Sequence, residues 1–215
     1  MIEDAGGALP GSFTIGAQMD LLTGAFHVVA VVIVVGGAAK VASPDAFAAL
    51  LRSLGLPGGT ALARLAGAVE VALGCTAVVV GGVVATGAVA LAYAVFAAVV
   101  VVARRRGAAS CGCFGAAAAP PSPVHVAVNS ISALIAGAAA VVGGIPDLVT
   151  VLGDQPLAGV PYMVLVGVGT WLAVTIDTTG AVVLERMSAV AELRPTFQAN
   201  SGHSHQPART GGRRR

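Results

Sequence analysis

Long uncharged segments, separated by short charged or glycine-rich breaks, dominate the chain. A helix needs about 20 apolar residues to cross roughly 30 Å of hydrocarbon. The pattern predicts five such spans, at about residues 21–39, 61–82, 85–103, 124–143 and 158–176. Apolar and polar residues do not alternate along these segments, which disfavours a transmembrane β-barrel. The sequence therefore predicts an all-α fold, a polytopic membrane helix bundle.

The division into five spans depends on one break. No charged residue occurs between Val71 and Arg104, and as one helix this stretch would measure about 50 Å, too long for a single crossing. We therefore expect a turn at Gly81 and Gly82. The prolines at 120, 121 and 123 suit the first turn of a helix, where a missing N–H costs no hydrogen bond. They mark the entrance to the fourth span.

The predicted organisation has four parts: an outer N-terminal segment (1–20), a four-helix core (21–145), a loop with the fifth helix (146–177) and a tail (178–215). The first twenty residues contain no Lys or Arg, which argues against a cleaved signal peptide. The tail carries a short amphipathic segment at 182–193, a weak candidate metal site at His203 and His205, and six arginines. We expect it to be largely disordered and to rest on anionic lipid.

Composition supports the membrane prediction. Of the 215 residues, 56% are hydrophobic and 10% are charged, against roughly 25% charged in an ordinary soluble domain. The mean hydropathy is +0.89, so a water-soluble domain is excluded. Three cysteines are too few for a disulfide-stapled secreted domain. A net charge of +2 does not suggest nucleic-acid binding, and the expected partner is the lipid bilayer.

The basic residues all fall on one side of the predicted membrane. Assigning the loops alternately gives twelve Lys and Arg on one side and none on the other. The basic side contains Lys40, Arg52, Arg64, the arginines at 104–106 and the arginines of the tail. The positive-inside rule then predicts a multi-pass plasma-membrane protein with its N-terminus outside and its C-terminus in the cytoplasm.

The segment Ser110-Cys-Gly-Cys-Phe-Gly115 carries the candidate chemistry. In a regular helix Cys111 and Cys113 would point about 200° apart, so the two sulfurs can meet only at a turn. Gly112 and Gly115 can supply that turn. A disulfide across one residue would be strained and easily reduced, which favours a pair that cycles between dithiol and disulfide. Nearby arginines at 104–106 could stabilise a thiolate.

Other interpretations of this pair remain open. The two sulfurs could bind Cu(I) or supply half of a zinc site, with His125 as a third ligand and no evident fourth. They could also be inert thiols at a packed helix junction of a non-enzymatic assembly or scaffold subunit. No phosphate-binding loop, dinucleotide fingerprint or hydrolase triad is evident. The sequence therefore predicts no cofactor and assigns no metal site.

Polar residues within the spans suggest contacts between helices. Glu70 lies about nine residues into the second span, where an ionisable group needs a partner. Lys40 can reach inward from the end of the first span, so we expect a Lys40–Glu70 contact, with Gly67 and Gly74 allowing close packing. A protonated Glu70 that serves thiol chemistry is the alternative. Asn129 is expected to bond across helices, and Cys75 to be a small buried side chain.

These features together carry a family resemblance. The matching elements are Gly36-Gly-Ala-Ala-Lys40, Ser43-Pro44 with Phe47, Gly55-Leu56-Pro57, Val69-Glu70 with Leu73-Gly74, Cys111-Gly-Cys-Phe-Gly115 and Asn129. The sequence resembles the methylamine utilisation protein MauE family, within the wider MauE/DoxX-like group of redox-associated membrane proteins. The resemblance covers about residues 21–145.

The resemblance implies a multi-helix membrane protein associated with disulfide chemistry. In the methylamine system this family is linked to processing, transport or maturation of the methylamine dehydrogenase β-subunit, alongside a thioredoxin-like partner. Any enzymatic role would be that of a thiol–disulfide oxidoreductase component. Cys111 and Cys113 would react, and Gly112, Phe114, Gly115, Lys40, Glu70 and Asn129 would support them.

Overall fold

The computed structural model of the chain describes residues 10–114, 120–154, 159–180, 182–183 and 186–187. Within these residues the structure is helical and contains no strand. The elements are α1 (Pro10–Ala42), α2 (Asp45–Ser53), α3 (Thr60–Val79), α4 (Gly82–Arg105), α5 (Pro123–Val141), α6 (Leu148–Asp154), α7 (Gly159–Thr175) and the π-helix η2 (Ile176–Gly180). The predicted all-α bundle is confirmed.

Five of the described helices are long and apolar enough to cross a membrane. Their spans are Leu21–Ala42, Thr60–Val79, Gly82–Arg105, Pro123–Val141 and Gly159–Gly180. These match the five predicted spans and support a multi-pass membrane protein. Helix α1 itself begins at Pro10, well before the expected start of the first span. The predicted amphipathic segment at 182–193 and the tail histidines lie largely or wholly outside the described residues.

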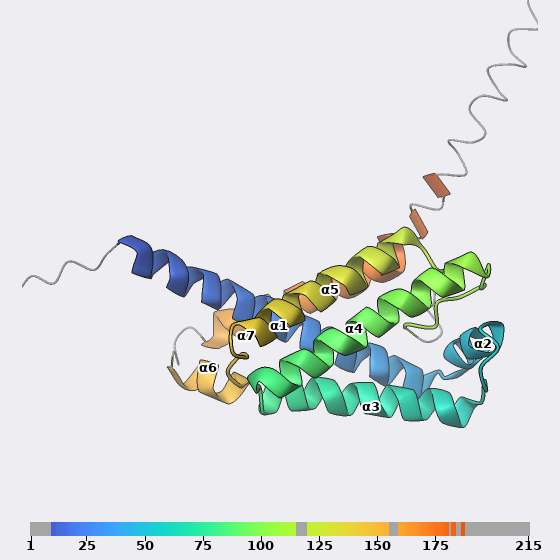
Figure 1. Cartoon of the computed structure of the whole chain (residues 1–215), viewed down its shortest axis with the longest axis horizontal. Helices are drawn as coiled ribbons and strands as arrows, with labels where there is room; N and C mark the ends of the chain where they lie inside the picture. The colour runs from blue at the N-terminus through green and yellow to red at the C-terminus, as the bar shows by residue number, and fades with distance from the viewer. Residues whose placement is uncertain (1–9, 115–119, 155–158, 181, 184–185, 188–215) are drawn as a thin grey trace, which may run out of the picture.

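Two short helices in the connections were not predicted. The nine-residue α2 follows α1 and buries Ala48 and Leu50. The seven-residue α6 follows α5. Figure 1 shows α2 and α6 at opposite ends of the bundle. Each end of the bundle therefore carries one short connecting helix, α2 at one end and α6 at the other.

The turn between α3 and α4 occurs where the sequence predicts it. Gly81 and Gly82 have φ values of 64° and 79°, which favour glycine. The N–H of Gly82 donates to the carbonyl oxygen of Ile145 over 2.8 Å. A Cβ atom at Gly81 would collide with that same carbonyl group. The α3–α4 turn is thus fixed against the segment that follows α5.

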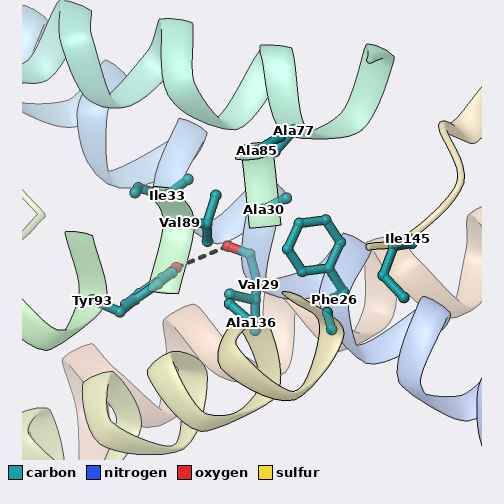
Figure 2. Close-up of a cluster of buried hydrophobic side chains, with 11 residues drawn as sticks. Phe26, Val29, Ala30, Ile33, Ala77, Ala85, Val89, Tyr93, Ala136 and Ile145 are labelled. Carbon is teal, nitrogen blue, oxygen red and sulfur yellow. Dashed lines mark hydrogen bonds between the residues drawn. The ribbon is translucent and has the colours of Figure 1, made fainter. Parts of the chain in front are cut away.

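A core of buried apolar side chains joins four of the long helices. Figure 2 shows this cluster, in which the Tyr93 hydroxyl of α4 donates to the Val29 carbonyl of α1 over 2.8 Å. The cluster consists of Phe26, Val29, Ala30, Ile33, Ala77, Ala85, Val89, Tyr93, Ala136, Ala139 and Ile145. Because these residues come from α1, α3, α4, α5 and the segment after α5, the core packs these elements against one another.

Helices α1 and α3 approach each other closely through glycine. A Cβ atom at Gly37 would lie 2.6 Å from the Gly67 carbonyl oxygen and 2.8 Å from the Glu70 Cβ atom. A Cβ atom at Gly74 would lie 2.7 Å from the Ala30 carbonyl oxygen. Backbone contact of this kind needs residues without side chains. The close approach expected at Gly67 and Gly74 is present, and it places Glu70 against α1.

Candidate functional site

The loop that carries the two cysteines leaves α4 through a tight turn. It spans residues 106–122 and is described at 106–114 and 120–122; we call it the cysteine loop. Gly107 has a φ of 65°. The N–H of Gly107 donates to the Arg104 carbonyl (3.1 Å), and that of Ala108 to the Ala103 carbonyl (3.0 Å). This glycine-centred hydrogen-bond pattern ends α4 and reverses the direction of the chain. The described part of the loop lies beside α2 at one end of the bundle (Figure 1).

Gly112 holds the middle of the cysteine loop against α2. Its φ is 66°, and its N–H donates to the Ser110 hydroxyl oxygen over 3.0 Å. A Cβ atom at this position would lie 2.7 Å from the Cα atom of Phe47. Two independent features therefore require glycine at position 112: its positive φ and its close packing against the Phe47 backbone. Gly115 lies outside the described residues.

The turn brings the two thiols together. Cys111 and Cys113 are both free cysteines, and their side chains hydrogen bond with each other. The Cys113 thiol also lies 3.7 Å from the Cys111 carbonyl oxygen. Cys111 is only 1% exposed. A close pair at a bend, as the spacing predicts, is thus present, with Cys111 buried and Cys113 half-buried.

His125, which the sequence suggested only as a possible third metal ligand, contacts the thiol pair. Its side chain hydrogen bonds with the Cys111 thiol. Ser122 caps α5 reciprocally: its N–H donates to His125 Nδ1 over 3.1 Å, and its hydroxyl oxygen accepts from the His125 backbone N–H over 3.4 Å. With Nδ1 accepting from the backbone, the neutral ring carries its proton on Nε2. That nitrogen is free to donate to Cys111.

The contacts shift the pKa values of the two thiols in opposite directions and favour ionisation of Cys111. The hydrogen bond from Cys113, opposed by burial and aided by a hydrogen bond from His125, holds the pKa of Cys111 well below its usual range. The hydrogen bond to Cys111 and burial raise the pKa of Cys113. The arginines at 104–106, expected to act here, are exposed at the end of α4. The groups that lower the pKa of Cys111 are Cys113 and His125, and the arginines are not among them.

Lys40 connects α1, α3 and the cysteine loop. Its Nζ atom lies 2.7 Å from Glu70 Oε2 and donates to the Cys113 carbonyl over 3.2 Å. It also lies 5.5 Å from the ring centroids of both Phe47 and Phe96. The expected Lys40–Glu70 pair is present, and both residues are buried. The same ammonium group therefore neutralises a carboxylate and positions the loop.

A small cavity lies beside the thiols. Its volume is about 50 Å³, enough for a few water molecules, since one water needs about 10–15 Å³. Its apolar lining includes Phe114, which places that predicted supporting residue in the site. Its polar lining comes from Lys40, Glu70, Cys111, Cys113, Asn129 and Asp177. Among the described residues no three His, Cys, Asp or Glu side chains are arranged to hold a metal ion.

Two expectations about single residues were wrong. Asn129 lines the cavity, but its Nδ2 atom donates to the His125 carbonyl one turn earlier in α5 over 2.7 Å, not across helices. Cys75 is exposed, because its neighbour Gly74 faces α1 and the next residue turns about 100° away. The sequence also missed Asp177, which is 3% exposed. An ionisable residue at the end of a predicted span was the available signal.

Alanine substitutions at two glycines of the cysteine loop separate backbone strain from steric contact. Gly107 and Gly112 have nearly equal positive φ values, but only Gly112 lies against Phe47. Gly107→Ala is expected to cost about 1–2 kcal/mol from the left-handed backbone. Gly112→Ala adds the collision, so it should also displace the thiols and raise the alkylation rate of Cys111. Rates measured by mass spectrometry check this; equal rates in the two variants would contradict the packing on α2.

Comparison with known proteins identifies a family for this chain. A family model described as Methylamine utilisation protein MauE matches residues 18–142. The matched range contains most of α1, all of α2 to α5 and the cysteine loop, whereas α6, α7 and η2 lie beyond it. No curated protein and no solved structure matches the chain.

Proposed function

Since the chain belongs to the MauE family of methylamine utilisation proteins, we propose that it is a membrane component of thiol–disulfide exchange, with Cys111 and Cys113 as the reacting pair. The observation that carries the proposal is the hydrogen bond between the two thiols inside a closed turn. His125 on Cys111 is a second support, because a donor to sulfur stabilises the nucleophilic thiolate. An inert pair at a packed junction has no need of this donor.

The exchange proceeds through a mixed disulfide with a thioredoxin-like partner. The Cys111 thiolate attacks one sulfur of the partner's disulfide, forming a Cys111–partner bond and releasing the partner's other sulfur as a thiolate. Cys113 then loses its proton and attacks Cys111, so the intramolecular disulfide forms and the partner's second sulfur leaves. The pair loses two electrons and the partner gains them. The reverse sequence reduces the Cys111–Cys113 disulfide.

Burial of the nucleophile adds a requirement. Because Cys111 is 1% exposed, a partner sulfur reaches it only when the cysteine loop moves away from α2. The contacts to be broken are the packing of Gly112 on Phe47 and the hydrogen bond from Lys40 to the Cys113 carbonyl. Opening of the loop thus precedes exchange with any disulfide, and a protein partner that binds the open loop would favour it.

The charge distribution supports a cytoplasmic position for the pair. Six basic residues lie at the end of the bundle that holds the cysteine loop, where α1, α2 and α4 end and α3 begins. They are Lys40, Arg52, Arg64 and the arginines at 104–106. The positive-inside rule assigns that end to the cytoplasm. The N-terminus is then outside, and the pair exchanges with a cytoplasmic thioredoxin-like protein. We assign this exchange to the processing, transport or maturation of the methylamine dehydrogenase β-subunit.

Thiol trapping in intact cells tests the exchange. In a Cys75→Ser background, acid quenching and differential alkylation should find Cys111 and Cys113 partly joined, with the oxidised fraction rising after an oxidant pulse. Cys113→Ser should accumulate a mixed disulfide at Cys111, because the resolving thiol is missing. Thiols that stay reduced throughout, with no trapped partner, would favour a non-enzymatic scaffold.

Cysteines placed at two exposed glycines test the orientation. Gly153 in α6 and Gly59 before α3 lie at opposite ends of the bundle, and an added side chain meets no atom within 4 Å at either. In a background with all three native cysteines changed to serine, Gly153→Cys should react with an impermeant maleimide in intact cells. Gly59→Cys should react only after permeabilisation. The opposite pattern would invert the assignment.

A further inference from the structure

Asp177 places a buried carboxyl group in the cavity of the thiol pair. It is 3% exposed, and it lines the same cavity as Cys111 and Cys113. Its Oδ1 atom has no hydrogen-bond partner among the described residues. A buried carboxyl oxygen without a partner is costly, most of all in a membrane-spanning helix, and such groups mark functional sites. Packing alone does not explain this residue.

The surroundings of Asp177 differ from those of Glu70, the other carboxyl group of the cavity. Glu70 is paired with Lys40 at 2.7 Å and acts as a fixed counter-ion. Asp177 lies within electrostatic range of Lys40 of α1, Tyr93 of α4, His125 of α5 and both thiols. Its free oxygen leaves it able to take up a proton.

The backbone around Asp177 is also unusual. The residue belongs to the π-helix Ile176–Gly180, which continues α7. Short π-helical segments are rare and occur frequently at functional sites. This segment lies outside residues 18–142, the part of the chain that the family model matches. The fifth span thus contributes the Asp177 carboxyl group to the cavity of a cysteine pair that lies within the family-matched part of the chain.

On the premise of thiol exchange at the cysteine pair, we propose that Asp177 accepts the proton of the Cys113 thiol in the step that closes the intramolecular disulfide. Cys113 needs an acceptor because its burial favours the protonated thiol, also when Cys111 is bonded to the partner. The cavity has room for a few water molecules, which can link the Asp177 carboxylate to the Cys113 sulfur. His125 faces Cys111 and serves the other sulfur.

The step balances in atoms and electrons. The Cys113 S–H bond breaks, and its proton moves through water to the Asp177 carboxylate, which becomes a neutral acid. The electron pair left on Cys113 forms the bond to Cys111, and the bond between Cys111 and the partner sulfur breaks. The partner leaves as a thiolate with that bonding pair. In the reverse direction the Asp177 acid returns the proton to Cys113 as it leaves.

Two-phase kinetics with 4,4′-dithiodipyridine test the proposal on the full chain in lipid vesicles, in the Cys75→Ser background. The first equivalent of thiopyridone reports attack by Cys111, and the second reports closure by Cys113. Asp177→Asn should slow the second phase at least about tenfold at pH 7, with the first phase within twofold of wild type. The defect should disappear at high pH, where hydroxide removes the thiol proton.

Control variants keep the outcome interpretable. Asp147→Asn makes the same change at the opposite end of the bundle and should leave both phases unchanged, whereas Asp177→Glu keeps a carboxyl group and should restore most of the second phase if Asp177→Asn folds poorly. A second phase that is unchanged in Asp177→Asn, or slowed equally at every pH, overturns the role of Asp177. Release of only one equivalent by the parent protein would instead overturn thiol exchange itself.

Discussion

Replacing Lys40 with methionine is expected to lower the free energy of unfolding by about 3–5 kcal/mol, the cost of leaving one partner of a buried ion pair alone. Glu70 would lose the ammonium group 2.7 Å away, and its carboxylate is buried. The Cys113 carbonyl would lose its donor as well. Unfolding of the full chain in mixed micelles, followed by circular dichroism, measures the effect.

The double variant Lys40→Met with Glu70→Met is the matched control. Replacing both partners of a buried pair by apolar residues of similar size is often neutral or stabilising, so the double variant should recover most of the lost stability. Glu70→Met alone leaves Lys40 unpaired and should resemble Lys40→Met. A single variant as stable as the double would mean that Lys40 and Glu70 are not both ionised in the bundle.

The same double variant separates stability from the position of the cysteine loop. It restores a neutral interface between α1 and α3, but it lacks the donor to the Cys113 carbonyl. We therefore expect a stable protein in which Cys111 is alkylated faster than in the wild type. Recovery of both stability and the slow alkylation rate would show that Lys40 does not hold the loop.

The second large effect concerns the two thiols, whose pKa values are expected to be shifted in opposite directions from that of an ordinary thiol. In a Cys75→Ser background, Cys111 should remain alkylatable by iodoacetamide below pH 7, because its lowered pKa keeps the thiolate populated as the pH falls. Cys113→Ala removes the leading cause of that lowering and should raise the pH midpoint of Cys111. At a pH below the midpoint, the thiolate fraction falls about tenfold for every whole pH unit by which the midpoint rises.

Cys111→Ala provides the complementary measurement. Burial and the hydrogen bond to Cys111 raise the pKa of Cys113, so the loss of Cys111 should move its midpoint down toward an ordinary thiol. Alkylation rates at several pH values, resolved by mass spectrometry, give all these midpoints. Equal midpoints for Cys111 and Cys113 in the intact pair would contradict the division into nucleophile and resolving thiol.

The sequence predicted the features that depend only on the length of a hydrophobic segment or on the need of a buried charge for a partner. Span lengths follow from hydrophobic runs, and the break at Gly81 follows from the limit on a single crossing. The Lys40–Glu70 pair was predictable because both ionisable groups lie toward the same ends of neighbouring spans. Local pattern and the cost of isolated charge suffice for these predictions.

The remaining features depend on how helices rotate and pack. The hydrogen bond from His125 to Cys111 requires α5 to place its first turn beside the cysteine loop. The position of Asp177 requires α7 to end in a π-helix that faces the cavity. Closeness in sequence alone could not decide whether the arginines at 104–106 or a residue of another helix would act on the thiols, and His125 is the one that lowers the pKa of Cys111. Short helices such as α2 give too few residues for a clear period.

The central claim is that Cys111 and Cys113 act as one redox pair, and an equilibrium titration tests it most directly. The full chain in lipid vesicles, with Cys75 changed to serine, is equilibrated in glutathione buffers of stepped ratio and quenched by alkylation. We predict that both thiols disappear together in a single two-electron transition, which is lost in Cys111→Ser and in Cys113→Ser. Two thiols that remain alkylatable at every ratio would contradict the claim and leave a helical scaffold without redox function.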